Sequence, residues 1–156
     1  MHKLKKKKFE NLCIVQARMG SSRLPGKIVF ELDKKKTVIQ FLIQRLLKSK
    51  YVNKIIVATT TNREDKFLKK HLKNYDCEVF FGPSENVLKR YFDAAKFYKA
   101  DVIVRICADN PFIDPNQIDY LIKKFINKNF EGPKLCQFKK IQYFPLSTLI
   151  LCLKYI

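Results

Sequence analysis

The sequence predicts an α/β domain built on an open, mainly parallel sheet with helices on both faces. Two observations support this class. Four short β-rich stretches alternate with four amphipathic stretches, as in parallel sheets covered by helices. Each expected helix also begins at a capping signal of its own. With 156 residues, 47% of them hydrophobic, the chain is long enough for one such domain with a full core.

The expected strands cover residues 12–16, 54–59, 78–81 and 101–106. Capping-box spacings precede three of the expected helices, namely Thr37 with Gln40, Thr61 with Glu64, and Asp114 with Gln117 before Pro115. The remaining expected helix, over residues 85–98, has a simpler cap, Ser84 followed by Glu85. Apolar residues recur three and four apart in the last two helices, which predicts buried stripes made of Val87, Leu88, Tyr91, Phe92 and Ala95, and of Ile118, Leu121, Ile122 and Phe125.

The formal charge of +18, from 32 basic and 14 acidic residues, raises the possibility of a nucleic-acid-binding protein. The distribution of charge argues against this function, because most lysines are spread singly or in pairs over the expected helices. Six of the basic residues are arginines, and two of these, Arg18 and Arg23, fall within one short loop. Arginine binds phosphate through two parallel hydrogen bonds, so this localisation favours a small phosphorylated ligand over a polymer.

The histidines and cysteines bear on the class of site and on the compartment. His2 and His71 lie far apart in sequence, which gives little support to a histidine metal centre or a Ser–His hydrolase. The odd number of cysteines, without a C-x-x-C pair, suits reduced thiols in the cytoplasm. No secretory signal is apparent, and the apolar stretch over residues 146–156 is short of the roughly 20 residues that span a bilayer. We therefore expect a cytoplasmic protein without a membrane span.

Residues 17–27, directly after the first expected strand, have the composition of a phosphate-binding loop. Glycines allow backbone N–H groups to approach an anion, serine hydroxyls donate hydrogen bonds, and basic side chains neutralise a triphosphate. Ligands of open α/β sheets also gather beyond the carboxyl ends of the strands. The candidate nucleotide-binding residues here are Ala17, Arg18, Gly20, Ser21, Ser22, Arg23 and Lys27.

Two familiar phosphate-binding motifs do not match this loop. A Walker A loop needs four residues between its glycines and a hydroxyl after its lysine, whereas five residues separate Gly20 from Gly26 and Ile28 follows Lys27. The G-x-G-x-x-G pattern of dinucleotide sites is also missing. The alternative that composition leaves open is a basic connecting loop without a ligand.

The run Gln-Ala-Arg-Met-Gly-Ser-Ser-Arg-Leu-Pro-Gly-Lys over residues 16–27 resembles the nucleotide-binding signature of the cytidylyltransferase superfamily, which includes the CMP-Kdo and CMP-sialic acid synthetases. Residues 57–62, 86–91 and 104–115 are similar to the spore-coat polysaccharide biosynthesis protein F branch, in the same order. The resemblance covers roughly residues 11–130. It implies the Rossmann-like fold of nucleotide-diphospho-sugar transferases, with CTP and an anionic sugar as substrates.

By the same resemblance, Asp109 is the aspartate that binds the Mg²⁺ bridging to the nucleotide phosphates. Taken alone, it reads equally well as a turn former before Asn110-Pro111. The implied mechanism is in-line attack of a sugar hydroxyl on the α-phosphorus of CTP, with Arg18, Lys27 and Asp109 as the catalytic set and Arg23 assisting at the phosphates.

Three further residues are candidates for nucleotide binding. Arg90 and Arg105 could contact substrate or phosphate, although a helix-face ion pair and a strand-end surface charge explain them as well. Thr59, at the end of the second expected strand, could face the base, but a loop with a helix cap accounts for it equally.

The pattern divides the chain into a basic tail at 1–10, a nucleotide-binding α/β domain at 11–130 and an atypical stretch at 131–156. Family members continue with an acceptor-sugar site and a dimerisation element, neither of which is recognisable after Phe130. We therefore expect a truncated reading of a longer gene with doubtful turnover, and a homodimer or a complementing partner as the source of a missing half. A nucleotide-binding remnant without catalysis, and less so a basic nucleic-acid-binding protein, remain as alternatives.

Overall fold

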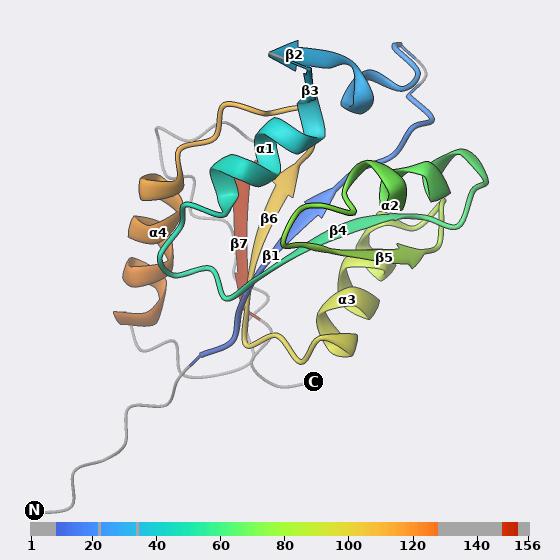
Figure 1. Ribbon diagram of the computed structural model, residues 1–156. Helices are drawn as coiled ribbons and strands as arrows, with labels where there is room; N and C mark the ends of the chain where they lie inside the picture. Colours follow the sequence, from blue (N-terminus) through green and yellow to red (C-terminus); the bar gives the residue numbers. More distant parts are fainter. Residues whose placement is uncertain (1–8, 22, 34, 128–147, 153–156) are drawn as a thin grey trace, which may run out of the picture.

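The computed structural model describes residues 9–21, 23–33, 35–127 and 148–152, and its centre is a five-stranded sheet in the order β5-β4-β1-β6-β7 (Figure 1). The strands are β1 (Asn11–Gln16), β4 (Lys54–Thr60), β5 (Glu78–Gly82), β6 (Val102–Cys107) and β7 (Thr148–Cys152). The first four are mutually parallel, and β7 is antiparallel to β6. The four expected strands are confirmed to within one residue at each end, whereas β7 was not predicted.

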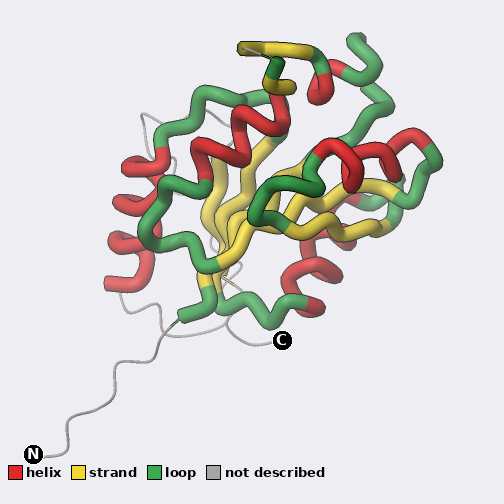
Figure 2. The backbone as a smooth tube through the Cα atoms, in the orientation of Figure 1, coloured by secondary structure: helices red, strands yellow, loops and turns green. Residues whose placement is uncertain are grey.

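Helices cover both faces of this sheet, which confirms the predicted fold class (Figure 2). On one face α1 (Val38–Leu46), α2 (Phe67–His71) and α4 (Pro115–Asn127) pack against the strands, and on the other lies α3 (Val87–Phe97). Alternation along β1 feeds both cores, because Cys13 and Val15 point to the first face and Leu12 and Ile14 to the second. All four of these side chains are fully buried, as expected of a central strand in a doubly covered sheet.

Several short elements lie outside the main series of strands and helices. A small antiparallel hairpin of β2 (Glu31–Asp33) and β3 (Lys36–Thr37) precedes α1. Two 3-10 turns, η1 (Lys27–Val29) and η2 (Glu64–Lys66), follow the loops after β1 and β4. Among the described residues no helix is long and apolar enough to cross a membrane.

The predicted caps were partly right. At α1 the capping box is present, with Gln40 N donating to Thr37 Oγ1 at 3.4 Å and Thr37 N donating to Gln40 Oε1 at 3.0 Å. Pro115 opens α4 as predicted, but the Asp114 carboxylate accepts from Asn116 N at 2.9 Å instead of joining Gln117 in a box. The 3-10 turn before α2 has no side-chain cap, so the box of Thr61 with Glu64 was wrong.

The prediction for α3 also needs two corrections. Its cap is Asn86, whose Oδ1 accepts from Lys89 N at 2.8 Å, and not Ser84, because the helix begins later than the sequence pattern suggested. Within the predicted stripe Tyr91 and Ala95 are buried, but Leu88 is 70% exposed because it lies on the outer side of the first turn.

The end of α3 offers a stability prediction. Lys99 has a positive φ of 54°, while Ala100 N donates to Ala95 O at 2.9 Å, the bond of a Schellman ending. Since a left-handed conformation strains a residue with a Cβ, Lys99→Gly should raise the free energy of unfolding by about 0.5–1 kcal/mol. Urea denaturation measures this, and Lys99→Ala, which keeps the Cβ, is the control expected to give no gain.

Candidate functional site

The carboxyl ends of β1, β4 and β6 meet at one edge of the sheet. Gln16 pairs in register with Ala58 on one side and Cys107 on the other, so the three strands end side by side. The segments that follow them are the loop over residues 17–27, the turn leading to η2, and the turn that contains Asp109. The sequence-predicted phosphate loop and metal ligand therefore share the edge at which open α/β sheets bind ligands.

The loop over residues 17–27 closes on itself through one carbonyl. Met19 O accepts hydrogen bonds from Ser21 N at 2.9 Å and from Gly26 N at 2.8 Å. Gly26, the residue before η1, has a φ of 71°. Glycine adopts this left-handed conformation at no steric cost. The closure places Lys27 at the end of a turn that begins near Arg18.

Lys27 and Asp109 form an ion pair across this edge. Lys27 Nζ donates to Asp109 Oδ2 at 3.1 Å, and 37% and 53% of the two side chains are exposed. The residues are 82 positions apart in sequence, so the pair joins the loop after β1 to the turn after β6. An exposed pair of this kind contributes about 0–1 kcal/mol, so an incoming anion and cation can separate it at low cost.

The other predicted loop residues differ in accessibility. Arg18, Gly20 and Arg23 are exposed, and Ser21 is half-buried. Ala17 is buried because its N–H continues the sheet by donating to Ala58 O at 3.2 Å. Ser22 lies outside the described residues. The surface of the loop is thus cationic, and its first residue belongs to the sheet.

Asp65, which the sequence reasoning missed, connects the loop to β4. It is 1% exposed, and its Oδ1 accepts from Met19 N at 2.6 Å. Its Oδ2 accepts from Thr60 N at 3.2 Å and from the Thr60 hydroxyl. A carboxylate five residues after the end of a buried strand was the available signal, but Glu64-Asp65 reads locally as an acidic helix start.

Arg90 is buried and not the helix-face ion pair that one alternative suggested. It is 1% exposed, and its Nη1 donates to Pro83 O at 2.7 Å, while Nε and Nη2 find no partner among the described residues. Burial lowers the pKa of the Arg90 guanidinium, Asp65 acts to raise it, and Arg18 acts to lower it. Arg90 thus lies within the electrostatic reach of the loop, although its side chain does not come to the surface.

Arg105 stands on the same face of the sheet as α3. Its Nη2 donates weakly to Gln16 Oε1 at 3.4 Å, and its guanidinium carbon lies 5.4 Å from the centre of the Tyr91 ring. It is therefore a half-buried, stacked cation and not a free surface charge. The neighbouring Cys107 thiol has a raised pKa, mainly because it is buried. A raised pKa disfavours the thiolate form that a cysteine nucleophile needs.

Thr59 does not reach the site surface. Its side chain is fully buried, and its hydroxyl has no hydrogen-bond partner in the described part of the chain. The contact between Thr59 and a nucleotide base stays a prediction, because the side chain is enclosed in this structure.

The donors at this edge fit Mg²⁺ bound through a single carboxylate. The described residues contain no group of three or more His, Cys, Asp or Glu side chains that could hold a metal ion. Mg²⁺ commonly uses one or two carboxylates together with substrate phosphates and water, so it does not require such a group. The exposed Asp109 carboxylate beside a cationic loop meets that requirement.

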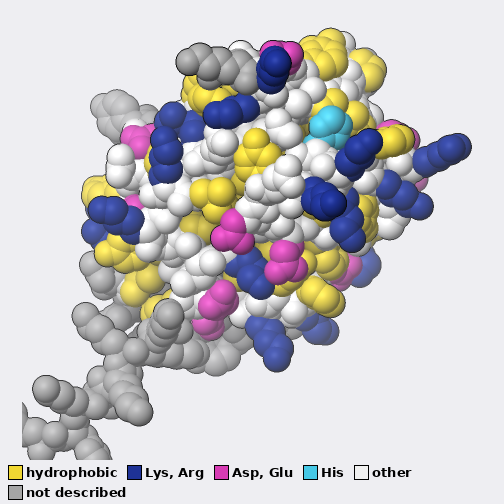
Figure 3. Space-filling model, viewed as in Figure 1, with side chains coloured by type: hydrophobic (Ala, Val, Ile, Leu, Met, Phe, Trp, Pro, Cys, Tyr) yellow, Lys and Arg dark blue, Asp and Glu magenta, His cyan; other side chains and the backbone are white. Residues whose placement is uncertain are grey.

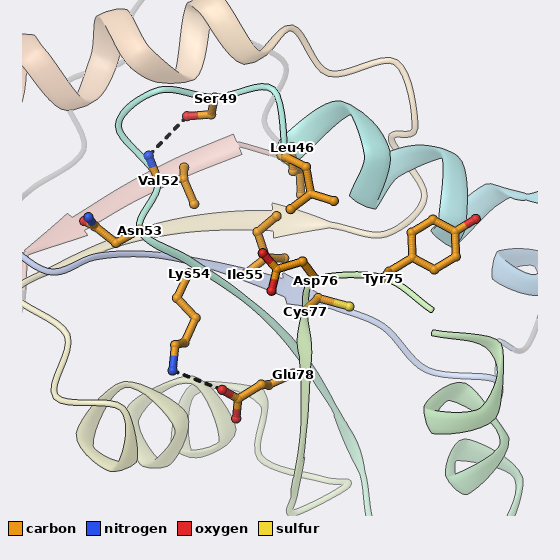
Figure 4. A pocket seen from close by; sticks show the side chains of 11 residues that line it. Leu46, Ser49, Val52, Asn53, Lys54, Ile55, Tyr75, Asp76, Cys77 and Glu78 are labelled. Carbon is orange, nitrogen blue, oxygen red and sulfur yellow. Dashed lines mark hydrogen bonds and ion pairs between the residues drawn. The ribbon is translucent and has the colours of Figure 1, made fainter. Parts of the chain in front are cut away.

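The two described cavities lie away from this edge. The smaller, of about 300 Å³, opens at the amino ends of β4 and β5 and is lined by Lys54, Tyr75, Cys77 and Glu78 among others (Figure 4). The larger, of about 490 Å³, lies beside the hairpin turn and His71. Lys27 and Asp109 line neither of these two cavities.

Basic side chains on the face shown in Figure 3 are scattered among apolar and uncharged ones and do not form a continuous stripe. One face does not decide whether nucleic acid is a partner, and its exclusion stays a prediction from the sequence.

A mainly parallel sheet with a glycine-containing cationic loop after its first strand is an architecture that many nucleotide-binding α/β domains share. The chain belongs to the cytidylyltransferase family, whose model matches residues 12–145 and so extends past the limit near residue 130 expected from the sequence.

Among curated relatives, the chain is 36% identical over 116 residues to the spore coat polysaccharide biosynthesis protein SpsF of Bacillus subtilis, covering 72% of this chain and 48% of the relative. It is 31% identical over 118 residues to a 3-deoxy-manno-octulosonate cytidylyltransferase of Chlorobium limicola, covering 74% and 46%. A solved cytidylyltransferase of Leptospira borgpetersenii superimposes with a TM-score of 0.74 at 35% identity, covering 78% of this chain and 51% of that one. The chain spans about half the length of the curated relatives it matches.

Proposed function

We propose that this chain binds CTP together with Mg²⁺ at the carboxyl edge of its sheet, as the nucleotide-binding part of an enzyme that transfers CMP to a sugar acid for polysaccharide biosynthesis. The observation that carries the proposal is the pairing of Lys27 with Asp109 at 3.1 Å. It brings the cation expected at the phosphates next to the carboxylate expected at the metal. The names of the relatives support cytidine as the nucleoside and a sugar acid as the acceptor.

In this proposal the Lys27–Asp109 pair separates when nucleotide enters. Lys27, Arg18 and Arg23 turn to the phosphate oxygens, while Asp109 holds Mg²⁺, which when bound withdraws charge from the α-phosphate. The acceptor hydroxyl oxygen forms a bond to the α-phosphorus as the bond to the β-phosphate oxygen breaks. The hydroxyl proton passes to solvent, and the three cationic side chains stabilise the departing pyrophosphate.

Nucleotide binding can be tested on the 156-residue chain itself. A ligand at about 100 times its Kd stabilises the native state by roughly 2.7 kcal/mol, which for a chain of this size raises Tm by about 5–11 °C. We expect CTP with Mg²⁺ to produce such a rise, and UTP and ATP to produce smaller ones. No change in Tm and no calorimetric heat at millimolar CTP would contradict the proposal. Binding to DNA that CTP does not compete with would favour the nucleic-acid alternative.

The assignment of Asp109 as the Mg²⁺ ligand can be tested with a variant at that position. Asp109→Asn keeps the shape of the side chain but removes its charge, so CTP should still bind while its affinity no longer responds to Mg²⁺. The measurement is a CTP titration with and without Mg²⁺. Asp93→Asn, at an exposed pair on α3, is the matched control and should retain the full response. Equal Mg²⁺ dependence in both variants would return Asp109 to the role of a turn former.

Pyrophosphate release separates the two remaining candidates. A chain that binds CTP and releases pyrophosphate with a sugar acid is a working transferase, whereas binding without release identifies a nucleotide-binding module. Both outcomes are compatible with the site geometry, and neither changes the expected role of Lys27 or Asp109.

A further inference from the structure

Asp65 is a buried carboxylate whose hydrogen-bond donors come from two separate segments. One oxygen accepts from Met19 N in the loop after β1, and the other accepts from the N–H and the hydroxyl of Thr60 at the end of β4. The first contact joins residues 46 positions apart in sequence. Burying a carboxylate is costly unless hydrogen bonds satisfy it, so an anion kept at 1% exposure requires this full set of donors.

The contact with Met19 controls both ends of the cationic loop. Arg18 immediately precedes Met19, so fixing the Met19 N–H fixes the peptide that carries Arg18. The Met19 carbonyl in turn accepts from Gly26 N at 2.8 Å, and Gly26 immediately precedes Lys27. A single carboxylate therefore sets the positions of both cations that the proposed phosphate site needs.

Asp65 also acts on the charge of Arg90. Burial is the main cause that lowers the pKa of the Arg90 guanidinium, Arg18 also acts to lower it, and the Asp65 carboxylate acts to raise it. Asparagine could not replace it without loss, because both carboxylate oxygens accept from backbone N–H groups and an amide offers only one oxygen.

We propose that Asp65 is a positioning residue for nucleotide binding: it holds the loop over residues 17–27 against the end of β4, so that Arg18 and Lys27 are preorganised for phosphate. This inference rests on the proposed function for its ligand, but the anchor itself can be measured without nucleotide. Asp65 touches no phosphate or metal in this scheme, and it acts through Met19.

The first test compares Asp65→Asn with Asp119→Asn. Asp119 is also a buried carboxylate, 8% exposed, that accepts from backbone N–H groups of a loop, those of Lys50 and Tyr51, but it lies away from the phosphate loop. Both variants should lose stability. Asp65→Asn alone should weaken CTP–Mg²⁺ binding by the folded protein, by about tenfold or more, because a misplaced loop loses preorganised contacts. Equal Kd values for the two variants would overturn the proposal.

The second test uses no nucleotide. The Met19 amide proton, bonded to a carboxylate at 2.6 Å, should resonate downfield and exchange slowly in the NMR spectrum of the wild type. In Asp65→Asn it should move upfield and exchange faster. An unchanged Met19 signal overturns the anchor even if CTP binds, whereas a wild type that binds no CTP and keeps this signature defeats the proposed function alone.

Thr60 supplies a third variant in case Asp65→Asn does not fold. Thr60→Val removes the hydroxyl that donates to Asp65, and Thr60→Ser keeps it. We expect Thr60→Val to disturb the Met19 signal and to weaken CTP binding several-fold, with Thr60→Ser restoring both. Indistinguishable Val and Ser variants would count against a positioning role for Asp65.

Discussion

Lys27→Ala is expected to weaken CTP binding by roughly 10- to 150-fold, both with and without Mg²⁺. A hydrogen bond to a charged group contributes about 1.5–3 kcal/mol, and each 1.4 kcal/mol corresponds to a factor of about ten in affinity. The substitution removes a half-exposed cation that pairs with Asp109, so the fold should remain intact. Isothermal titration calorimetry of the variant against CTP gives the change directly.

Lys96→Ala is the matched control for that measurement. Lys96 is exposed in the last turn of α3, away from the loop over residues 17–27, and carries the same charge. Its removal lowers the net charge equally, so it measures how much of the affinity comes from the general positive field. If both alanine variants bind CTP alike, the loop is a basic connection and not a phosphate site.

Asp119→Ala is expected to lower the free energy of unfolding by about 3 kcal/mol, because three part-buried donors lose their charged acceptor at about 1 kcal/mol each. The Asp119 carboxylate accepts from Ser49 Oγ at 2.5 Å, from Lys50 N and from Tyr51 N. It thereby fastens the loop between α1 and β4 to α4. Thermal unfolding should show a Tm lower by about 6–12 °C.

Asp93→Ala provides the comparison for this prediction. Asp93 pairs with Lys89 at 2.9 Å on the outside of α3, in an i,i+4 arrangement that contributes about 0.3–0.5 kcal/mol. Replacing Asp93 by alanine should therefore change the free energy of unfolding very little. Similar losses at the two positions would mean that the Asp119 hydrogen bonds contribute no more than a surface ion pair does.

Much of the fold could be predicted because its signals are local. Apolar runs such as that of β1 and the Thr37 capping box specify strands and helix starts within a few residues. The β2–β3 hairpin could not be predicted, since its strands are two and three residues long. Strand β7 was missed because residues 131–156 show no sustained helical or alternating pattern.

The proximity of Lys27 and Asp109 was predictable, because residues that follow parallel strands gather at one edge of the sheet. Their roles toward phosphate and metal stay predictions. Arg90 and Thr59 were chosen by type as well, but their burial depends on packing that no local pattern reveals. Asp65 was missed for the opposite reason, because its acidic sequence context resembles an exposed helix start, while its function depends on a partner 46 residues away.

The order of strands in the sheet has a consequence for how the chain acquires its structure. Cys13 in β1 pairs with Ile55 on one side and with Val104 on the other, so the central strand has no neighbour that is near in sequence. Closing such long loops costs entropy before the contacts are gained, which makes folding slow. Because synthesis runs from the amino terminus, β1 cannot form these pairs until β4 has been made, and the edge that carries Lys27 and Asp109 requires β6 as well.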